Sequence, residues 1–263
     1  MHELSQWQQV VEQTYPFFKK IKRYFVREAS YLKREQWTLN DLLDYTQLRH
    51  EFSDYLWLDP DELDALTLQV MDANHPEQAP LFEQFRHQAL AVHQDVYAPR
   101  PLYWGESRPV VTPGVPQLDE QGLSYRCNVA LVAHHSAQPQ IVGNWALDFA
   151  GDIPITRPAP ALEMTLNSLY LLPEWRGYGI GSVVNRVLSE LLCKILAPPL
   201  ARALPQELSA PPAIQFDANY TSRNGKRMGK QISRRLAPLA RKYGLLYYDS
   251  SDFSQQGSAR GMV

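Results

Sequence analysis

Cysteine is scarce in this sequence, with only Cys127 and Cys193 among 263 residues. One pair of thiols cannot form the disulfide framework that small secreted domains use, so we expect a reducing compartment. Long apolar runs are also missing, because no stretch approaches the roughly 18 residues that a membrane-spanning helix needs. The first residues carry neither a basic start nor an apolar core for export. These absences predict a cytoplasmic protein with no membrane span.

A strong net charge is absent as well. The chain has 26 Lys and Arg against 28 Asp and Glu, a formal net charge of -2, so its overall field favours neither nucleic acid nor membranes. Charge is biased locally, however. Residues 35–95 hold 13 acidic residues and only two basic ones, whereas residues 218–248 hold eight basic residues and no acidic one. With 44% hydrophobic residues, the composition is that of an ordinary globular protein.

Hydrophobic periodicity divides the chain into two sections. Residues 1–100 read as mainly helical, with one short candidate strand at Tyr24–Arg27. From residue 101 to 263 strands and helices alternate, and alternating apolar residues predict a hairpin of 125–133 and 141–149. The further predicted elements are a strand at 164–172, a helix reaching Leu196 and stopped by Pro198, a strand at 213–217, a basic helix at 222–236 that Pro238 ends or kinks, and a strand at 245–248.

Three glycines, Gly177, Gly179 and Gly181, lie where a strand turns into a helix. The first turn of a helix has unpaired N–H groups and a partial positive charge, and glycines let a phosphate approach the backbone closely. A dinucleotide fingerprint requires glycine or alanine where this chain has Ser182, and it requires an acidic residue about 20 positions later that is missing here. The segment 225–231 is one residue short of a P-loop and lacks its hydroxyl.

The remaining pattern is Arg176-x-x-Gly179-x-Gly181 after a strand that ends in Pro173-Glu174-Trp175. With the preceding hairpin and the following periodic helix, it resembles the GNAT superfamily of acyl-CoA-dependent N-acyltransferases over about residues 123–250. The resemblance implies an α/β fold with a mixed, largely antiparallel central sheet, one splayed strand junction and flanking helices. Residues 101–263 would then be the acyl-CoA-binding core, and the enlarged helical section 1–100 would form part of the acceptor cleft.

The resemblance also implies a function and a set of binding residues. An acyl group, most simply acetyl, would pass from acetyl-CoA or another acyl-CoA to a primary amine that attacks the thioester directly, without a metal. The loop would hold the coenzyme A pyrophosphate, and the backbone near Leu169 to Leu171 would pair with the pantetheine amides. The implied donor-binding residues are Leu169, Tyr170, Leu171, Arg176, Gly177, Tyr178, Gly179, Ile180, Gly181 and Asn219.

Candidate proton-transfer residues follow less directly. Strand parity places Glu163 on one face with Thr165, Asn167, Leu169 and Leu171, so Glu163 is the first candidate for the general base. Asp148, Asp217 and His134 are alternatives. Related proteins often protonate the leaving thiolate with a tyrosine seven residues after an asparagine, but this spacing leads from Asn219 to Lys226. Tyr220 and Ser222 are the substitutes that we consider.

Partners remain open at this point. The basic helix 223–242 could contact the coenzyme A 3′-phosphate or an acidic partner such as RNA or an acyl carrier protein, or it could be a solvated surface. The acidic segment 35–95 would attract a cationic acceptor if it lines the cleft. A non-catalytic coenzyme A-binding module, a longer acyl chain or a carrier-protein donor also fits the sequence. No histidine spacing suggests a metal site, and both cysteines are expected to be packing residues.

Overall fold

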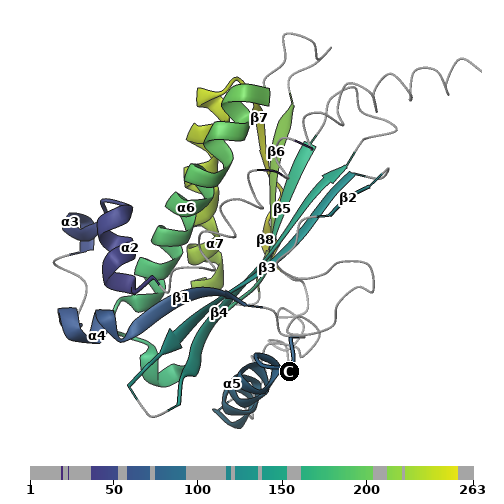
Figure 1. Ribbon diagram of the computed structural model, residues 1–263. Helices are drawn as coiled ribbons and strands as arrows, with labels where there is room; N and C mark the ends of the chain where they lie inside the picture. The colour runs from purple at the N-terminus through teal and green to yellow at the C-terminus, as the bar shows by residue number, and fades with distance from the viewer. Residues whose placement is uncertain are drawn as a thin grey trace, which may run out of the picture.

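The computed structural model describes residues 37–52, 58–71, 75–92, 117–119, 122–135, 138–152, 161–203, 212–220 and 223–253, together with Lys19 and Arg23. The predicted strand at Tyr24–Arg27 and the candidate Ser222 lie outside these residues. The described part has a mixed α/β fold, in which a twisted sheet is flanked by helices (Figure 1). None of its helices is long and apolar enough to cross a membrane.

The sheet contains antiparallel and parallel pairs. Its main path has the order β1-β3-β4-β5-β6-β7, while β2 pairs with β3 and β8 with β6. The pairs β1·β3, β2·β3, β3·β4 and β4·β5 are antiparallel, and β6 is parallel to β5, β7 and β8. The strands are β1 (Leu66–Met71), β2 (Gln117–Asp119), β3 (Gly122–Ala133), β4 (Gln140–Asp152), β5 (Ala161–Leu171), β6 (Ala213–Tyr220), β7 (Leu246–Asp249) and β8 (Asp252–Phe253).

Helices cover the two faces of the sheet unequally. The long helices α6 (Ile180–Ala203) and α7 (Arg223–Lys242) lie side by side on one face, and α5 (Ala79–Val92) lies on the other (Figure 1). Three short helices, α2 (Leu39–Tyr45), α3 (Arg49–Phe52) and α4 (Pro60–Asp64), lie at the outer side of α6. Thr38 and Asp59 form capping boxes at the starts of α2 and α4, which satisfy N–H groups of the first turn.

The strand register gives the two faces different chemistry, because partners across a sheet project to the same side. We call the side under α6 and α7 the apolar face. Its side chains include Trp145, Leu147, Phe149, Met164, Leu166, Ile214 and Phe216. We call the other side the polar face. Its side chains include Asn128, Asn144, Asp148, Glu163, Thr165, Ser168, Gln215 and Asp217. Most of the hydrophobic core therefore lies between the sheet and helices α6 and α7, and a smaller part, with Phe82, Phe85 and Ala89, lies under α5.

The predicted hairpin, the three later strands and the glycine loop between a strand and a helix are confirmed. The expected end of helix α6 is wrong, because α6 continues past Pro198 to Ala203. Of the two alternatives for Pro238, an end or a kink, the end is excluded, because α7 continues to Lys242. A proline removes only its own N–H donor, and the helical bonds on either side can continue when the helix packs against a neighbour. In α7 that packing is visible, because Leu236 and Ala240 on both sides of Pro238 are buried.

Strand β1 was not predicted, because we read residues 1–100 as mainly helical. It pairs antiparallel with β3 along its whole length, from Leu66 opposite Ala133 to Met71 opposite Asn128. The N-terminal section therefore contributes an edge strand to the sheet as well as helices. Whether this section lines an acceptor cleft stays a prediction.

Candidate functional site

The glycine loop has the backbone geometry that its sequence suggested. Gly177 has φ 94° and Gly179 has φ 84°, backbone angles that residues with a Cβ rarely adopt. The carbonyl of Gly179 accepts the N–H groups of Ser182 (3.0 Å) and Val183 (3.1 Å), so α6 starts directly after it. Within the described residues, the N–H groups of Tyr178, Gly179 and Ile180 donate to no backbone carbonyl. The loop thus presents unpaired donors at the positive end of a 24-residue helix.

A second helix begins at the same edge of the sheet. Helices α6 and α7 each follow a parallel strand and lead to the next one, so both start at the carboxyl ends of β5 and β6. Asn185 Nδ2 donates to the carbonyl of Met228 and to Oε1 of Gln231, each at 2.9 Å, which fixes the two helices together near their starts. Neither first turn holds an acidic residue, and α7 adds Arg223 and Arg227. The starts of these two helices therefore carry positive charge.

The polypeptide leading into the loop is held by aromatic and cationic contacts. The residues Pro173–Trp175 form a single 3-10 turn, and the Trp175 ring stacks on His135 from the β3–β4 connection at 5.6 Å between centroids. Arg176 Nε donates to the carbonyl of Leu171 at 2.8 Å, and its guanidinium lies 5.0 Å from the centre of the Tyr170 ring. Burial raises the pKa of Tyr170, although Arg176 partly opposes this shift. Arg176 is thus held beside the loop by these contacts, although the residue is exposed.

The strands β5 and β6 separate just before this loop. Their register runs from Ala161 opposite Ala213 to Leu166 opposite Ala218 and ends there, although β5 continues to Leu171. On its other edge, β5 carries one extra residue, because Leu166 pairs with Leu147 and Ser168 with Ala146, leaving Asn167 without a β4 partner. A bulge of this kind bends a strand and increases its twist. The bulge and the separation lie at the same point.

Beyond the bulge, alternate residues of β5 offer their backbone to the open edge. The N–H of Leu172 donates to the carbonyl of Val142 in β4 at 2.8 Å. Because polar backbone groups alternate along a strand, Tyr170 also faces β4, whereas Leu169 and Leu171 face the side where β6 has diverged. The bond from Arg176 to the Leu171 carbonyl agrees with this direction. Of the three predicted backbone positions, Leu169 and Leu171 lie at the open edge and Tyr170 does not.

Because of the bulge, the prediction that Glu163 shares a face with Leu169 and Leu171 is wrong. Across from β4, Glu163 pairs with Ala150, whereas Leu169 pairs with Trp145 and Leu171 with Gly143, which are on the apolar face. The extra residue at Asn167 reverses the alternation, so Glu163 shares the polar face with Ser168 and Tyr170 instead. Glu163 is half-buried there.

Further carboxylates lie beside Glu163 on the polar face. Thr165 is opposite Asp148 in β4 and opposite Asp217 in β6, so the three form one row across the sheet. Neighbouring strands are about 4.8 Å apart, which places the two aspartates about 10 Å from each other. Glu163 is one row away, beside Gln215. The three carboxylate candidates of the sequence therefore share the polar face, one each on β4, β5 and β6.

The other proton-transfer candidates have different surroundings. Tyr220 is buried beneath α7 on the apolar side, and burial raises its pKa against opposing contributions from Ser251 and Lys230. Its neighbour Asn219 is exposed and pairs with Asp252 of β8. His134 bonds through Nε2 to the hydroxyl of Thr67 at 2.9 Å, near β1 and away from the strand separation. Among the candidates that the structure describes, the carboxylates are the ones that share the polar face.

Two further polar groups on the polar face, at some distance along β4 and β5 from these carboxylates, were missed in the sequence. Asn144 is 1% exposed, and neither polar atom of its amide has a hydrogen-bond partner among the described residues. The buried hydroxyl of Ser168 has no partner among them either. Buried polar groups are normally paired, so these two groups are candidates for hydrogen bonds to a polar ligand or to water. An isolated Asn or Ser in a strand gives no such signal before the register is known.

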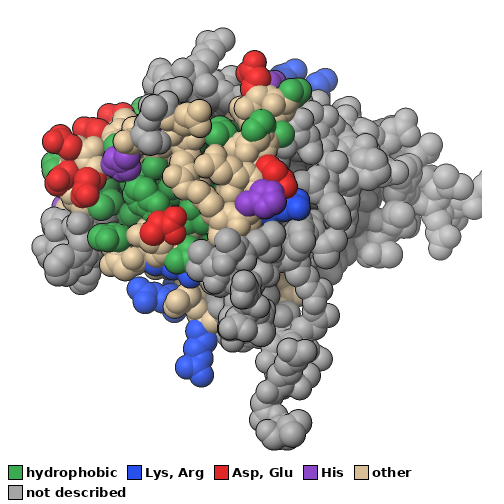
Figure 2. Space-filling view, turned by 90° about the horizontal axis from the view of Figure 1, so that it is seen from below, with side chains coloured by type: hydrophobic (Ala, Val, Ile, Leu, Met, Phe, Trp, Pro, Cys, Tyr) green, Lys and Arg blue, Asp and Glu red, His purple; other side chains and the backbone are tan. Residues whose placement is uncertain are grey.

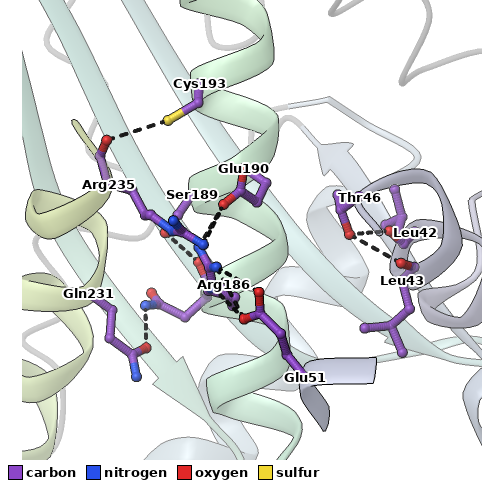
Figure 3. Close-up of polar contacts among 11 residues, drawn as sticks. Leu42, Leu43, Thr46, Glu51, Arg186, Ser189, Glu190, Cys193, Gln231 and Arg235 are labelled. Carbon is purple, nitrogen blue, oxygen red and sulfur yellow. Dashed lines mark hydrogen bonds and ion pairs between the residues drawn. The ribbon is translucent and has the colours of Figure 1, made fainter. Parts of the chain in front are cut away.

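The remaining chemistry-bearing residues have structural environments. Cys193 in α6 lies against the carbonyl of Arg235, and burial together with Glu190 raises its pKa to about 12. Close by, Arg186 contacts both Glu190 (2.6 Å) and Glu51 of α3 (3.1 Å), and Arg235 of α7 contacts Glu190 (3.0 Å) (Figure 3). Within the described residues, no three His, Cys, Asp or Glu side chains gather as a metal site would require.

A comparison of the chain with known protein families, with curated proteins and with solved structures finds no match.

Proposed function

We propose that this protein is an acyl-CoA-dependent N-acyltransferase with a GNAT-like core. The observation that carries the proposal is the position of the glycine loop. Its unpaired N–H groups lie at the start of α6. This start follows the part of β5 that has separated from β6 and that carries the bulge at Asn167. A diphosphate-binding helix start and an unpaired strand edge thus lie next to each other, as a donor made of a diphosphate and an extended amide chain requires.

The donor would bind through backbone groups. The pyrophosphate of coenzyme A fits the N–H groups of Tyr178 to Gly181, with Arg176 and the first turn of α7 supplying positive charge. The pantetheine amides would then pair with Leu169 and Leu171 like an added strand. This direction brings the thioester to the point of divergence near Leu166.

The acceptor amine would approach from the polar face. The neutral amine attacks the thioester carbonyl carbon, the C–S bond breaks, and coenzyme A leaves as a thiolate. The proton that the amine loses passes to a carboxylate, for which Glu163 is our first choice and Asp148 and Asp217 are alternatives. The three carboxylates on the polar face favour a cationic amine, because they attract its ammonium form, which must bind first. Tyr220 and Ser222 stay untested candidates for the proton donor to the thiolate.

Calorimetry with coenzyme A and acetyl-CoA tests the donor site. We expect binding by the native chain and none by Gly179→Val, because a β-branched residue resists φ 84° and its side chain would block the loop. Gly244→Val is the matched control, since Gly244 also has positive φ (68°) but lies after α7. Absence of coenzyme A binding by the folded native protein would end the proposal.

A non-catalytic coenzyme A-binding module is the second candidate, favoured by Lys226 at the position where related enzymes often have tyrosine. Release of free thiol from acetyl-CoA with a panel of amines separates the two. Turnover that falls at least tenfold in Glu163→Gln, with unchanged coenzyme A affinity, supports an enzyme whose base is Glu163. Binding without turnover on any amine supports the module. An acyl carrier protein or a longer acyl-CoA is tested as donor in the same assay.

A further inference from the structure

A row of arginines follows the outer side of α7. Arg223, Arg227, Arg234 and Arg241 are all exposed, and their spacing, in near-multiples of the helical repeat, aligns them along one side of the helix. We call these four residues the arginine stripe. The opposite side of α7 holds the buried residues Gly229, Ile232, Ser233, Leu236 and Ala240. Packing of that side against the sheet therefore directs the stripe outward.

The charge of the stripe is not neutralised by the described residues. None of its four guanidinium groups forms an ion pair with an Asp or Glu in that part of the chain. The carboxylates close to α7 are already paired with other residues, Asp249 with Lys230 at 2.8 Å and Glu190 with Arg235 at 3.0 Å. Because the protein as a whole has a net charge of -2, this concentration of positive charge is local and directional.

We propose that the arginine stripe binds nucleic acid through its phosphate backbone. The guanidinium group matches two phosphate oxygens at once, and all four residues of the stripe are arginine. The stripe extends about 27 Å along the helix, which is too long for one small anion. A nucleic-acid strand, in contrast, presents a phosphate about every 3.4 Å of axis and can meet the whole stripe.

An acidic protein fits this surface less well. Protein interfaces depend on buried aromatic or apolar anchors surrounded by polar residues. The large hydrophobic side chains exposed in the described residues are Tyr45, Tyr178, Leu246 and Tyr248, none of which belongs to α7. A surface with charge and no anchor favours contacts to a phosphate backbone, which are electrostatic and independent of base sequence.

The inference does not depend on acyltransferase activity. Arg223 and Arg227 lie in the first turns of α7 near the glycine loop, whereas Arg234 and Arg241 lie about 16 and 27 Å further along the helix from Arg223. The test therefore uses the double variant Arg234→Gln/Arg241→Gln. The control is Arg49→Gln/Arg86→Gln, which removes the same charge from the exposed Arg49 and the half-buried Arg86, already paired with Asp44 and Glu83.

Fluorescence anisotropy of a labelled single-stranded RNA, with duplex DNA as a second probe, measures binding to the full chain over a salt series. We expect the logarithm of the association constant to fall with the logarithm of salt, by about 0.7 for each phosphate contact on a single strand. The stripe variant should lose about 1.4 of that slope and bind about tenfold more weakly at low salt. The control variant should bind as the native chain does, and circular dichroism should show both variants folded.

Several outcomes would overturn the inference. One is no RNA or DNA binding by the native chain at low salt, and another is an equal loss of affinity in both double variants. Tighter binding of polyglutamate than of RNA at the same salt would identify an acidic-protein surface instead. Binding to phosphatidylserine vesicles that RNA does not displace would identify a lipid surface.

Discussion

At the scale of single residues, two helical glycines with opposite surroundings give a matched test of packing. A Cβ on Gly229 would lie under 3.0 Å from the ring and hydroxyl of the buried Tyr220, whereas a Cβ on Gly181 would meet Met228 at 3.6 Å, an ordinary contact. We expect Gly229→Ala to lower the free energy of unfolding by about 1–3 kcal/mol through overpacking. Gly181→Ala should leave it unchanged or raise it by up to about 1 kcal/mol through helix propensity. Urea denaturation measures both, and equal effects would refute the close packing of Tyr220 on α7.

The thiol of Cys193 gives a second residue-scale prediction. Burial and the neighbouring Glu190 raise its pKa to about 12, so the reactive thiolate is nearly absent at neutral pH. Iodoacetamide should therefore leave Cys193 unmodified in the folded protein and modify it fully after unfolding in urea. Peptide mass spectrometry locates the label. Rapid alkylation of the folded protein at Cys193 would contradict a packed, protonated thiol.

The lowered pKa of Asp249 predicts how the stability of the fold depends on pH. Its burial opposes ionisation, but hydrogen bonds from Lys230, Ser233 and Ser251 outweigh this and lower its pKa to about 2. The unfolded value is about 3.9. The carboxylate therefore stabilises the fold above about pH 4 and loses this contribution as the pH falls towards 2. We expect Asp249→Asn to cost about 1 kcal/mol at neutral pH, allowing for solvent screening, with the difference from the native chain vanishing at the acid end. A difference that stays constant with pH would show that the charge is not responsible.

At the scale of elements, the sequence predicted what local pattern controls. Alternation in 125–133 and 141–149 predicted the β3–β4 hairpin, and the glycines with the periodic apolar residues after them predicted the start of α6. The register between strands is decided by tertiary packing, so the sequence pattern did not predict the bulge in β5. The bulge at Asn167 moved Glu163 to a different face from Leu169 and Leu171. Asparagine is a poor strand residue, and it was the one local sign of the irregularity.

Two prolines also show that tertiary packing can override a local sequence signal in a helix. Pro198 and Pro238 are strong local signals for a helix end, yet α6 and α7 continue through them. In α7 the apolar residues on both sides of Pro238 are buried on the same side of the helix. Their packing outweighs the loss of one backbone hydrogen bond. The edge strand β1 was hidden for a related reason, because the short run 66–71 stands among helical patterns and its partner β3 is far away in sequence.

The contact between α3 and α6 predicts a local change in stability. Glu51 reaches Arg186 on α6, whose side chain is 14% exposed, and Arg186 also contacts Glu190 (Figure 3). We expect Glu51→Gln to lower the global free energy of unfolding by less than about 1 kcal/mol, because Glu51 is partly exposed and Arg186 keeps its second partner. Hydrogen exchange should nevertheless accelerate in residues 39–52. Glu77→Gln, at an exposed acidic residue away from α6, is the control. Unchanged exchange in 39–52 would show that apolar packing alone holds these helices.

At the scale of the whole molecule, charge is separated between two regions. Acidic side chains gather at the side where α2 to α4 lie (Figure 2), and α7 carries the basic residues. This separation would let a chain with a net charge of -2 attract a cation at one place and a polyanion at another, as the two proposals require. Net charge and isoelectric point hide such a separation, because they sum over the whole chain.

The separation predicts how salt affects turnover if the proposed acyltransferase activity holds. A triamine acceptor should show a kcat/KM that falls several-fold between low and physiological salt, whereas a monoamine should change much less, because attraction grows with the acceptor's charge and salt screens it. The double variant Asp61→Asn/Glu62→Gln, at exposed positions of α4, should reduce kcat/KM for the triamine at low salt with the monoamine unaffected. Steady-state thiol release measures all four cases. Equal salt dependence for the two amines would place the acidic region away from the acceptor's path, while a loss with both amines would point to damage to the fold rather than to attraction.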